Sequence, residues 1–242
     1  MIDVEGIIIN TKNYSDTSKI LDIYTREYGV IGVLAKGCKS LKSSLRSVTD
    51  KLTYAVFTIY YKKDKLSLLS DANVIDNFSN VKKDIEKVSY VSYIVDLSYQ
   101  VYKQNDSKDI YNILISAIKK INDNFNPLII TNIVELKYLN YLGVMPNLSE
   151  CTICGSKNVL TLSSDKGGYI CSKCYTDEPI VSTKAIKLSR MYTLVDIDKI
   201  EKLDINSNVV SEVNNFINDY YDRYTGLYLK SKNFLKDITG LK

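Results

Sequence analysis

Short apolar runs separated by turn residues dominate the first 75 residues of the chain. The runs are rich in Val, Ile, Thr and Tyr, and they lie at residues 4–10, 20–24, 29–35, 52–61 and 66–75. Such runs are typical of β-strands, and Tyr28-Gly29 and residues 63–65 are typical of tight turns. Five short strands within about 75 residues predict a small closed barrel of the OB type or a small sandwich.

The pattern becomes helical from about residue 78. Apolar residues recur at helical intervals in residues 84–104, after Ser107 or Asp109, from Asn126-Pro127 to Gly143, and in residues 183–194 and 207–229. Asparagine before proline is a favourable helix start, and glycine is a common helix stop. The sequence therefore predicts an α+β protein, with an OB-fold β-barrel at residues 1–77 followed by an α-helical domain at residues 78–242.

An insert with two Cys-x-x-Cys pairs interrupts the helical half of the chain. Cys151 and Cys154 form the first pair, and Cys171 and Cys174 follow after sixteen residues. Two such pairs predict a tetrahedral site of four thiolates, which suits Zn²⁺, and iron fits the same geometry. Four cysteine ligands leave no open position for a substrate, so we expect a structural four-cysteine zinc finger at residues 151–174. Cys38 lies far away in the sequence and is assigned no role.

Composition narrows the class of protein. The chain of 242 residues is 45% hydrophobic and 25% charged, and its 32 Lys and Arg against 28 Asp and Glu give a net charge of +4. It contains no His, which excludes histidine general bases, Ser-His-Asp triads and His-ligated metals. The first residues lack the basic and apolar regions of a signal peptide, and no apolar run is long enough for a membrane span. We therefore expect a cytoplasmic protein with reduced cysteines.

The segment between the third and fifth predicted strands carries a larger net positive charge than the whole chain. Between Lys36 and Lys65 the chain has eight Lys and Arg against two Asp, a local charge of +6. Such asymmetry indicates a nucleic-acid-binding face, or alternatively a solvated loop that keeps the protein in solution. Tyr54, Tyr60 and Tyr61 are candidate stacking platforms for bases, or alternatively packing residues of the barrel.

Several short stretches of sequence follow one another in a fixed order along the chain. In the N-terminal half they are EGIIINT, TSKI, YTREYG, AKG and KSSLR, which begin at residues 5, 17, 24, 35 and 42. In the helical half they are ELKYLNYLGVMP, CTICG and LKSKNFL, which begin at residues 135, 151 and 229. Together they resemble the bacterial recombination mediator family RecO over nearly the whole chain. Two departures are Cys38, where alanine is common, and a loop rich in Lys and Ser where relatives often carry more Arg.

The resemblance implies a mediator of DNA repair and recombination that catalyses no bond chemistry. It implies an N-terminal nucleic-acid-binding OB-fold, binding of single- and double-stranded DNA, and annealing of complementary strands. The implied partners are RecR and the C-terminal tail of single-stranded DNA-binding protein, and the implied outcome is RecA loading near the nucleoid. The residues that the resemblance and the charge pattern assign to DNA binding are Arg26, Lys36, Lys39, Lys42, Arg46 and Lys51.

Two other functions are compatible with the residues alone. A metal-dependent nuclease needs acidic ligands, for which Asp196 and Asp198 are candidates, although such pairs are commonly found in surface turns. A zinc-ribbon accessory factor of transcription or translation would use the cysteine insert to bind its partner and would show no strand annealing.

Overall fold

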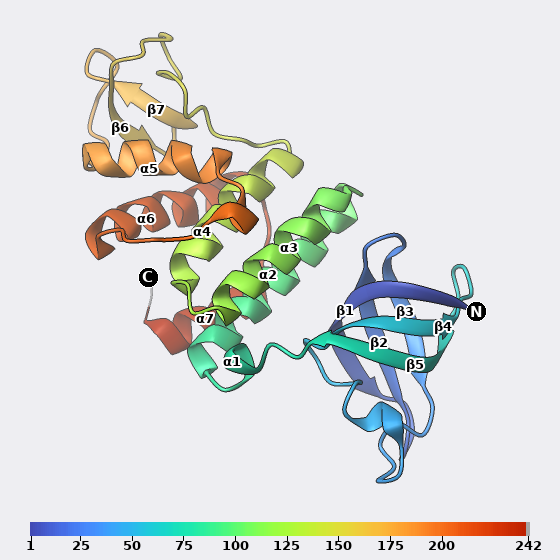
Figure 1. The fold of residues 1–242 in the computed structure, drawn as a ribbon. Helices are drawn as coiled ribbons and strands as arrows, with labels where there is room; N and C mark the ends of the chain where they lie inside the picture. Colours follow the sequence, from blue (N-terminus) through green and yellow to red (C-terminus); the bar gives the residue numbers. More distant parts are fainter. Residues whose placement is uncertain (241–242) are drawn as a thin grey trace. The chain divides into compact units, whose positions relative to one another are not determined.

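Five strands form a closed barrel at the N-terminal end of the computed structural model, which describes residues 1–240 (Figure 1). The strands are β1 (Ile2–Asn13), β2 (Lys19–Thr25), β3 (Gly29–Ala35), β4 (Tyr54–Tyr60) and β5 (Ser67–Asp76). Their order around the barrel is β1-β2-β3-β5-β4, and β4 pairs back onto β1. The β3–β5 pair is parallel and the other pairs are antiparallel. The barrel is OB-like, as the sequence predicts.

The alternation of side chains along each strand explains why the barrel closes. Ile23 of β2 and Ile31 and Val33 of β3 point into one buried apolar core, while the residues between them lie nearer the surface. Gly6 on β1 permits a close approach of β2, because a Cβ at this position would lie 2.8 Å from the carbonyl oxygen of Tyr24. Any larger residue at position 6 would push these two strands apart.

Helices make up most of the remaining chain (Figure 1). They are α1 (Ser79–Lys82), α2 (Ile85–Gln104), α3 (Lys108–Asn122), α4 (Pro127–Tyr141), α5 (Thr183–Leu194), α6 (Ser207–Tyr224) and α7 (Lys230–Thr239). Side chains of Asp84, Asn126 and Ser182 accept backbone N–H groups at the starts of α2, α4 and α5. These N-caps satisfy donors that have no partner inside the helix. The predicted helix starts at Asn126-Pro127 and at residue 183 are therefore confirmed.

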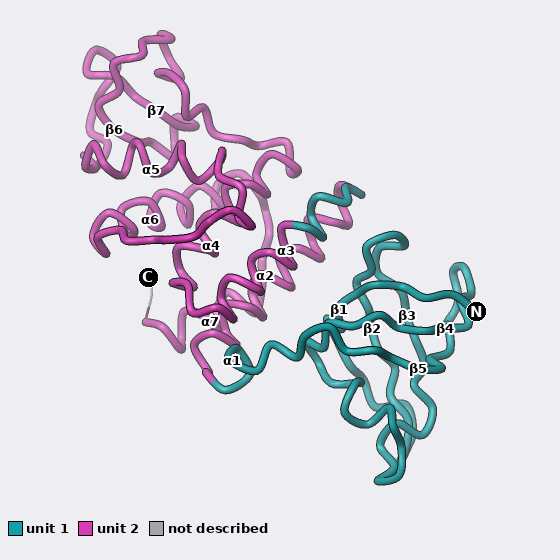
Figure 2. Tube along the Cα trace, viewed as in Figure 1, with its two compact units in different colours: residues 1–83, 106–112 teal, residues 84–105, 113–242 magenta. Residues whose placement is uncertain are grey.

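The chain divides into two units, shown in separate colours in Figure 2. One unit comprises residues 1–83 together with residues 106–112, and the other comprises residues 84–105 and the chain from residue 113 onward. The barrel unit therefore includes the beginning of α3. There the Tyr111 ring packs edge-on against Tyr24 with centroids 5.4 Å apart, and the Tyr111 hydroxyl donates to Glu5.

The central helix of the second unit is α4, which contacts α2, α5 and α6. Ile130, Leu136 and Tyr138 on different sides of α4 are completely buried. A helix that is apolar all round is stable only when neighbours cover every face. None of the helices in residues 1–240 has the length and apolar character required to cross a membrane.

A buried polar cluster attaches α7 to α2 and α4. The Tyr93 hydroxyl donates to the Glu135 carboxylate over 2.6 Å, and the Lys232 ammonium lies 3.7 Å from the same oxygen atom. The Lys232 ammonium also lies over the rings of Tyr93 and Tyr221. Burial raises the pKa of Glu135, and the nearby Lys232 charge and the Tyr93 hydrogen bond offset part of that rise.

The C-terminal part of the helical unit differs from the sequence prediction. The predicted helix at residues 207–229 ends at Tyr224, and Gly226 follows with a φ of 61°. This left-handed conformation favours glycine and redirects the chain. The separate helix α7 was not predicted from the sequence, and only Leu235 among its residues is buried.

We expect Glu135 to contribute stability that decreases as the pH rises above the ordinary pKa of glutamate. The folded state binds the Glu135 proton more tightly than the unfolded chain does, so this group contributes stability that is lost as the pH approaches the raised pKa. Urea unfolding from about pH 4 to about pH 7 would measure this slope. Glu135→Gln should flatten it, and Glu201→Gln, which changes an exposed glutamate, should not. An unchanged slope in Glu135→Gln would contradict the assignment.

Candidate functional site

The basic loop, which we define as residues 36–53 between β3 and β4, is anchored to the barrel where it begins. Cys38 is 1% exposed and belongs to the barrel core. The Gly37 N–H donates to the Ser18 hydroxyl over 3.2 Å, and the Lys39 N–H donates to the Thr17 carbonyl over 2.9 Å. The anchoring role of Cys38 was missed in the sequence, because its burial depends on how the loop folds back.

The rest of the basic loop is fixed by its own turns and by its return to the sheet. The Ser43 hydroxyl caps the short 3-10 helix η1 (Ser44–Arg46) by accepting the Leu45 N–H. Val48 is buried, and the Leu52 N–H donates to the Ile8 carbonyl over 2.8 Å. The loop is therefore an ordered platform for its charged side chains.

The positive charge of the basic loop faces solvent. Lys36, Lys42, Arg46 and Lys51 are exposed, and Lys39 is half-buried. Within residues 1–240 none of these five side chains forms a salt bridge. The acidic residue of the loop, Asp50, lies 3.0 Å from the Lys19 ammonium and is neutralised by it. The loop thus presents a cationic surface with little internal compensation, which can attract phosphate groups.

Arg26 lies apart from the other candidate DNA-binding residues. It follows β2 at the turn into β3, whereas Lys36 follows the opposite end of β3. Its guanidinium lies 3.9 Å from the Glu5 carboxylate, so part of its charge is compensated. The other five candidates therefore lie in the one loop between β3 and β4, and Arg26 lies at the other end of β3.

The three candidate stacking tyrosines have different environments. Tyr54 is buried and donates its hydroxyl to Glu5, and burial together with this hydrogen bond raises its pKa. Of the two roles that the sequence left open for Tyr54, packing within the barrel unit is the one that the structure supports. Tyr60 is exposed, and the half-buried Tyr61 contacts the ring of Tyr28.

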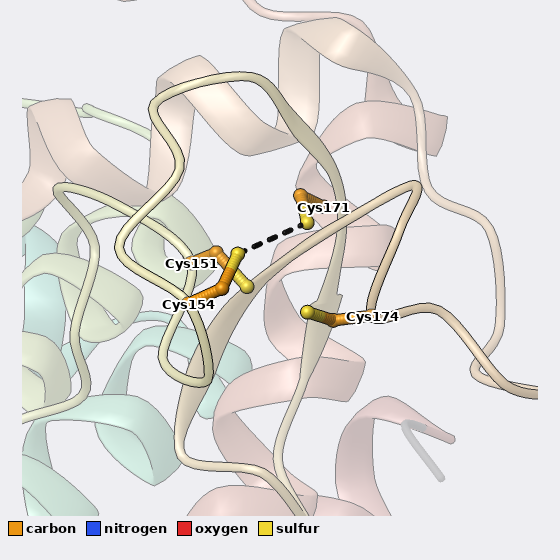
Figure 3. Close-up of side chains that lie close together, drawn as sticks. All are labelled: Cys151, Cys154, Cys171 and Cys174. Atoms are coloured by element: carbon orange, nitrogen blue, oxygen red, sulfur yellow. Dashed lines mark hydrogen bonds between the residues drawn. The ribbon is translucent and has the colours of Figure 1, made fainter.

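The four cysteines of the insert converge on one point, as the close-up in Figure 3 shows. Their sulfur atoms all lie within 4.8 Å of one another, and the sulfurs of Cys154 and Cys171 are 3.5 Å apart. Zinc–sulfur bonds of about 2.3 Å in a tetrahedron place the sulfurs roughly 3.8 Å apart. The quartet Cys151, Cys154, Cys171 and Cys174 therefore has the donor set and the spacing of a structural metal site.

Backbone hydrogen bonds shape the two cysteine turns. The Gly155 N–H donates to the Cys151 carbonyl over 2.9 Å, and the Cys174 N–H donates to the Cys171 carbonyl over 3.1 Å. Burial raises the pKa of the Cys151 thiol, but hydrogen bonds from the backbone N–H groups of Cys154, Cys171 and Ile153 outweigh it and bring this pKa to about 6. The hydrogen bond with Cys154 and burial raise the pKa of the Cys174 thiol, so the four thiols do not ionise equally.

The hairpin β6 (Val159–Ser163) and β7 (Gly168–Cys171) carries the second cysteine pair and is held at both ends. Gly168 has a φ of 146°, and a Cβ there would lie 2.2 Å from the Asn147 carbonyl oxygen. Asn147 accepts the Tyr169 N–H over 2.9 Å, and the Tyr169 hydroxyl donates to the Ile186 carbonyl of α5. The hairpin thus rests on α5 and on the segment that precedes the first cysteine pair.

The acidic pair proposed for a nuclease has a structural role. The Asp196 carboxylate accepts the Asp198 N–H at the start of the 3-10 helix η2 (Ile197–Lys199), and it pairs with Lys199 at 3.4 Å. Both aspartates are exposed turn residues. Within residues 1–240, the cluster of potential metal ligands lies at the four cysteines.

The N-terminal half is an OB-like barrel with a cationic loop, and the helical half carries a four-cysteine cluster. These features define an α+β protein that combines an OB-like barrel with a candidate metal site. Two family models match it, Recombination protein O N terminal over residues 1–78 and Recombination protein O C terminal over residues 82–233. The chain belongs to the RecO family.

Relatives named DNA repair protein RecO match almost the full chain. The protein of Listeria monocytogenes serotype 4b (strain CLIP80459) is 33% identical over 239 residues, which cover 97% of this chain and 93% of the relative. The protein of Halalkalibacterium halodurans is 31% identical over 242 residues, covering 98% and 95%. The protein of Bacillus pumilus is 30% identical over 247 residues, covering 100% and 96%.

We expect the double variant Cys171→Ser with Cys174→Ser to lose its bound metal and much of its stability. Loss of a structural metal costs on the order of 4 kcal/mol, which lowers the Tm of a chain of this size by roughly 8–16 °C. Metal content per chain and thermal unfolding are the measurements. Cys38→Ser is the matched control, because a hydroxyl in the barrel core should lower the Tm and leave metal content unchanged. One zinc ion per chain in the double variant would contradict the site.

Proposed function

We propose that this protein is a non-enzymatic mediator of DNA repair and recombination. It binds single- and double-stranded DNA, anneals complementary strands, and helps RecR load RecA onto strands covered by single-stranded DNA-binding protein. The observation that carries the proposal is the ordered basic loop on an OB-like barrel in a chain of the RecO family. The chain contains no histidine, and its candidate acidic pair caps a turn, which supports a function in binding.

The mechanism follows from charge neutralisation. Two complementary strands repel one another through their phosphates, and a cationic surface lowers that repulsion when it contacts both backbones. Lysine and serine side chains of the basic loop contact phosphate oxygens without reading bases. Base pairing then supplies the sequence specificity, so the protein needs no code for base edges. We assign this contact to Lys36, Lys39, Lys42, Arg46 and Lys51, with Arg26 as a secondary contact.

The cysteine quartet would hold Zn²⁺ as a structural ion. Four thiolates complete the coordination shell, so the metal would supply folding energy to the insert and no reaction. The hydrogen bond from Tyr169 to α5 and the close approach of Gly168 to Asn147 would then hold the zinc finger against α5. We place the boundaries of the functional domains at residues 1–77 for DNA binding and 78–242 for the helical domain, with the finger at residues 151–174.

Partner proteins complete the proposed activity. RecR and the C-terminal tail of single-stranded DNA-binding protein are the partners, and the cytoplasm, near the nucleoid, is the proposed location. Family membership supports these assignments. An annealing assay with complementary oligonucleotides, each covered by single-stranded DNA-binding protein, tests them directly. Faster strand pairing supports a mediator, and binding without any annealing would favour an accessory factor of another process.

We expect the quadruple variant Lys36→Ala, Lys39→Ala, Lys42→Ala and Arg46→Ala to bind DNA more weakly and with less dependence on salt. Removing one phosphate contact lowers the slope of log affinity against log salt by about 0.9, so the slope should fall by roughly 2–4. Fluorescence anisotropy of labelled DNA at several salt concentrations measures both effects.

A control with the same charge change uses exposed residues of the helical unit, Lys184→Ala, Lys187→Ala, Arg190→Ala and Lys202→Ala. It separates a local contact from the effect of net charge. An equal loss of affinity in both variants, or an unchanged salt slope in the first, would place the DNA contact elsewhere.

A further inference from the structure

A groove of about 730 Å³ lies in the helical unit, between the cysteine insert and α6. Its volume falls within the range of about 300–1,000 Å³ that is typical of binding sites. Three segments line it: residues 162–166 at the end of β6, residues 176–181 after the second cysteine pair, and one face of α6. None of the four clustered cysteines lines it. The groove is therefore a site separate from the cysteine quartet.

Hydrogen bonds and ion pairs hold the walls of this groove in place. The Thr161 hydroxyl donates to the Pro179 carbonyl over 2.6 Å and accepts the Val181 N–H over 3.3 Å. These bonds attach residues 179–181 to β6. On the other side, the Arg223 guanidinium of α6 lies 3.0 Å from the Asp165 carboxylate in the turn after β6. The groove is therefore built into the contact between the insert and α6.

The floor of the groove is apolar. Leu162 and Phe216 line it and are otherwise buried, with 4% and 7% of their surfaces exposed. Ile180 also lines it and is 58% exposed. Apolar surface left in contact with water favours an occupant that brings an apolar side chain.

Carboxylates outnumber cations in the lining of the groove. It contains the cations Lys166 and Arg223 and the carboxylates of Asp165, Asp177, Glu178, Glu212 and Asp219. Lys166 pairs with Glu178, and Arg223 pairs with Asp165 and Asp219. Within residues 1–240, neither Asp177 nor Glu212 forms a salt bridge. The excess negative charge repels phosphates and acidic segments and attracts a basic one.

The tip of the basic loop has the complementary character. Leu41 is 85% exposed, more than any other large apolar side chain in residues 1–240, and Lys39 and Lys42 are its neighbours in the loop. A turn orders this tip, since the Ser40 N–H donates to the Gly37 carbonyl over 3.1 Å. Phosphate contacts account for the lysines and leave the exposed leucine unexplained.

We propose that the groove binds the basic loop of a second copy of this chain. Leu41 of one copy contacts the apolar floor in the other, and Lys39 and Lys42 face the carboxylates of Asp177 and Glu212. Because the two surfaces differ, the contact is head-to-tail and generates chains or rings of copies. A loop held in the groove cannot contact phosphates, so self-association and DNA binding compete.

Sedimentation velocity of the full chain without DNA tests the contact. At about 0.1 M salt the average mass should rise with protein concentration, and at about 1 M salt the association should be weaker, because screening shortens the range of charge pairing. Leu41→Ser keeps every charge of the loop and should weaken association about tenfold. Leu194→Ser is the matched control, because Leu194 is 73% exposed and does not line the groove.

A charge reversal tests the groove from the other side. Asp177→Lys should abolish association by placing a cation opposite the lysines of the loop. Asp198→Lys makes the same change at an exposed position outside the groove lining and should leave association unchanged. A wild-type chain that stays monomeric at every concentration overturns the proposal, and the groove would then suit a basic segment of a different protein.

A mixture of the two defective variants distinguishes a head-to-tail contact from a symmetric one. The Leu41→Ser chain has an intact groove, and the Asp177→Lys chain has an intact loop. At a concentration where each variant alone is monomeric, the mixture should form dimers and no longer chains, because only one pair of intact surfaces remains. Absence of any complex in the mixture overturns the proposal, as does association of either variant at the wild-type level.

Addition of DNA separates this inference from the proposed function. Oligo(dT) of about 8 nucleotides, within the OB-fold site sizes of about 4–16 nucleotides, should dissociate the wild-type chains. Leu41→Ser should bind the same oligonucleotide with an unchanged salt slope, because its loop keeps every cation. A chain that associates without DNA and binds no oligonucleotide contradicts the proposed function alone. A chain that binds the oligonucleotide through the basic loop and remains associated overturns the contact proposed here.

Discussion

Closure of the barrel is the constraint that creates the basic loop, the candidate DNA-binding surface. The strand order β1-β2-β3-β5-β4 separates β3 from β4, because β5 lies between them. The chain must therefore leave the sheet after Ala35 and return at Tyr54, which creates the long basic loop. The same order makes β3–β5 a short parallel pair, which joins Val33 to Ser67 and Leu34 to Leu68. A sheet with β3 beside β4 would need only a tight turn and would have no such loop.

In the helical unit, the short hairpin of the cysteine insert depends on contacts outside its own two strands. A two-stranded hairpin is marginally stable in water. The strands of this hairpin are short, with five residues in β6 and four in β7. The four thiolates converge because the two turns and the hairpin are held by Asn147, Tyr169 and Gly168. A metal would stabilise this arrangement further by joining two segments that are distant in sequence. The cysteines of this protein are therefore of two kinds, the quartet whose sulfurs converge and Cys38, which packs in the barrel core.

The sequence predicts elements well where local periodicity agrees with the tertiary structure. Residues 183–194 form the predicted helix with its Ser182 cap, and the five predicted strands are all present. The predictions fail where distant contacts decide the outcome. The helix at residues 207–229 breaks at Gly226, and α7 depends on the Glu135–Lys232 pair, which joins residues far apart in the chain. Tyr54 and Tyr61 belong to the same predicted strand, yet only the folded barrel shows that Tyr54 is buried and that Tyr61 meets Tyr28.

Phosphate contacts alone would have a consequence for the proposed strand annealing. A duplex carries phosphates at a higher density than a single strand, so its affinity for a cationic surface depends more steeply on salt. A basic loop that contacts only phosphates would therefore not favour single strands over the duplex that they form. Under the proposed function, base pairing would supply the driving force for annealing, and the basic loop would lower the repulsion between the two strands.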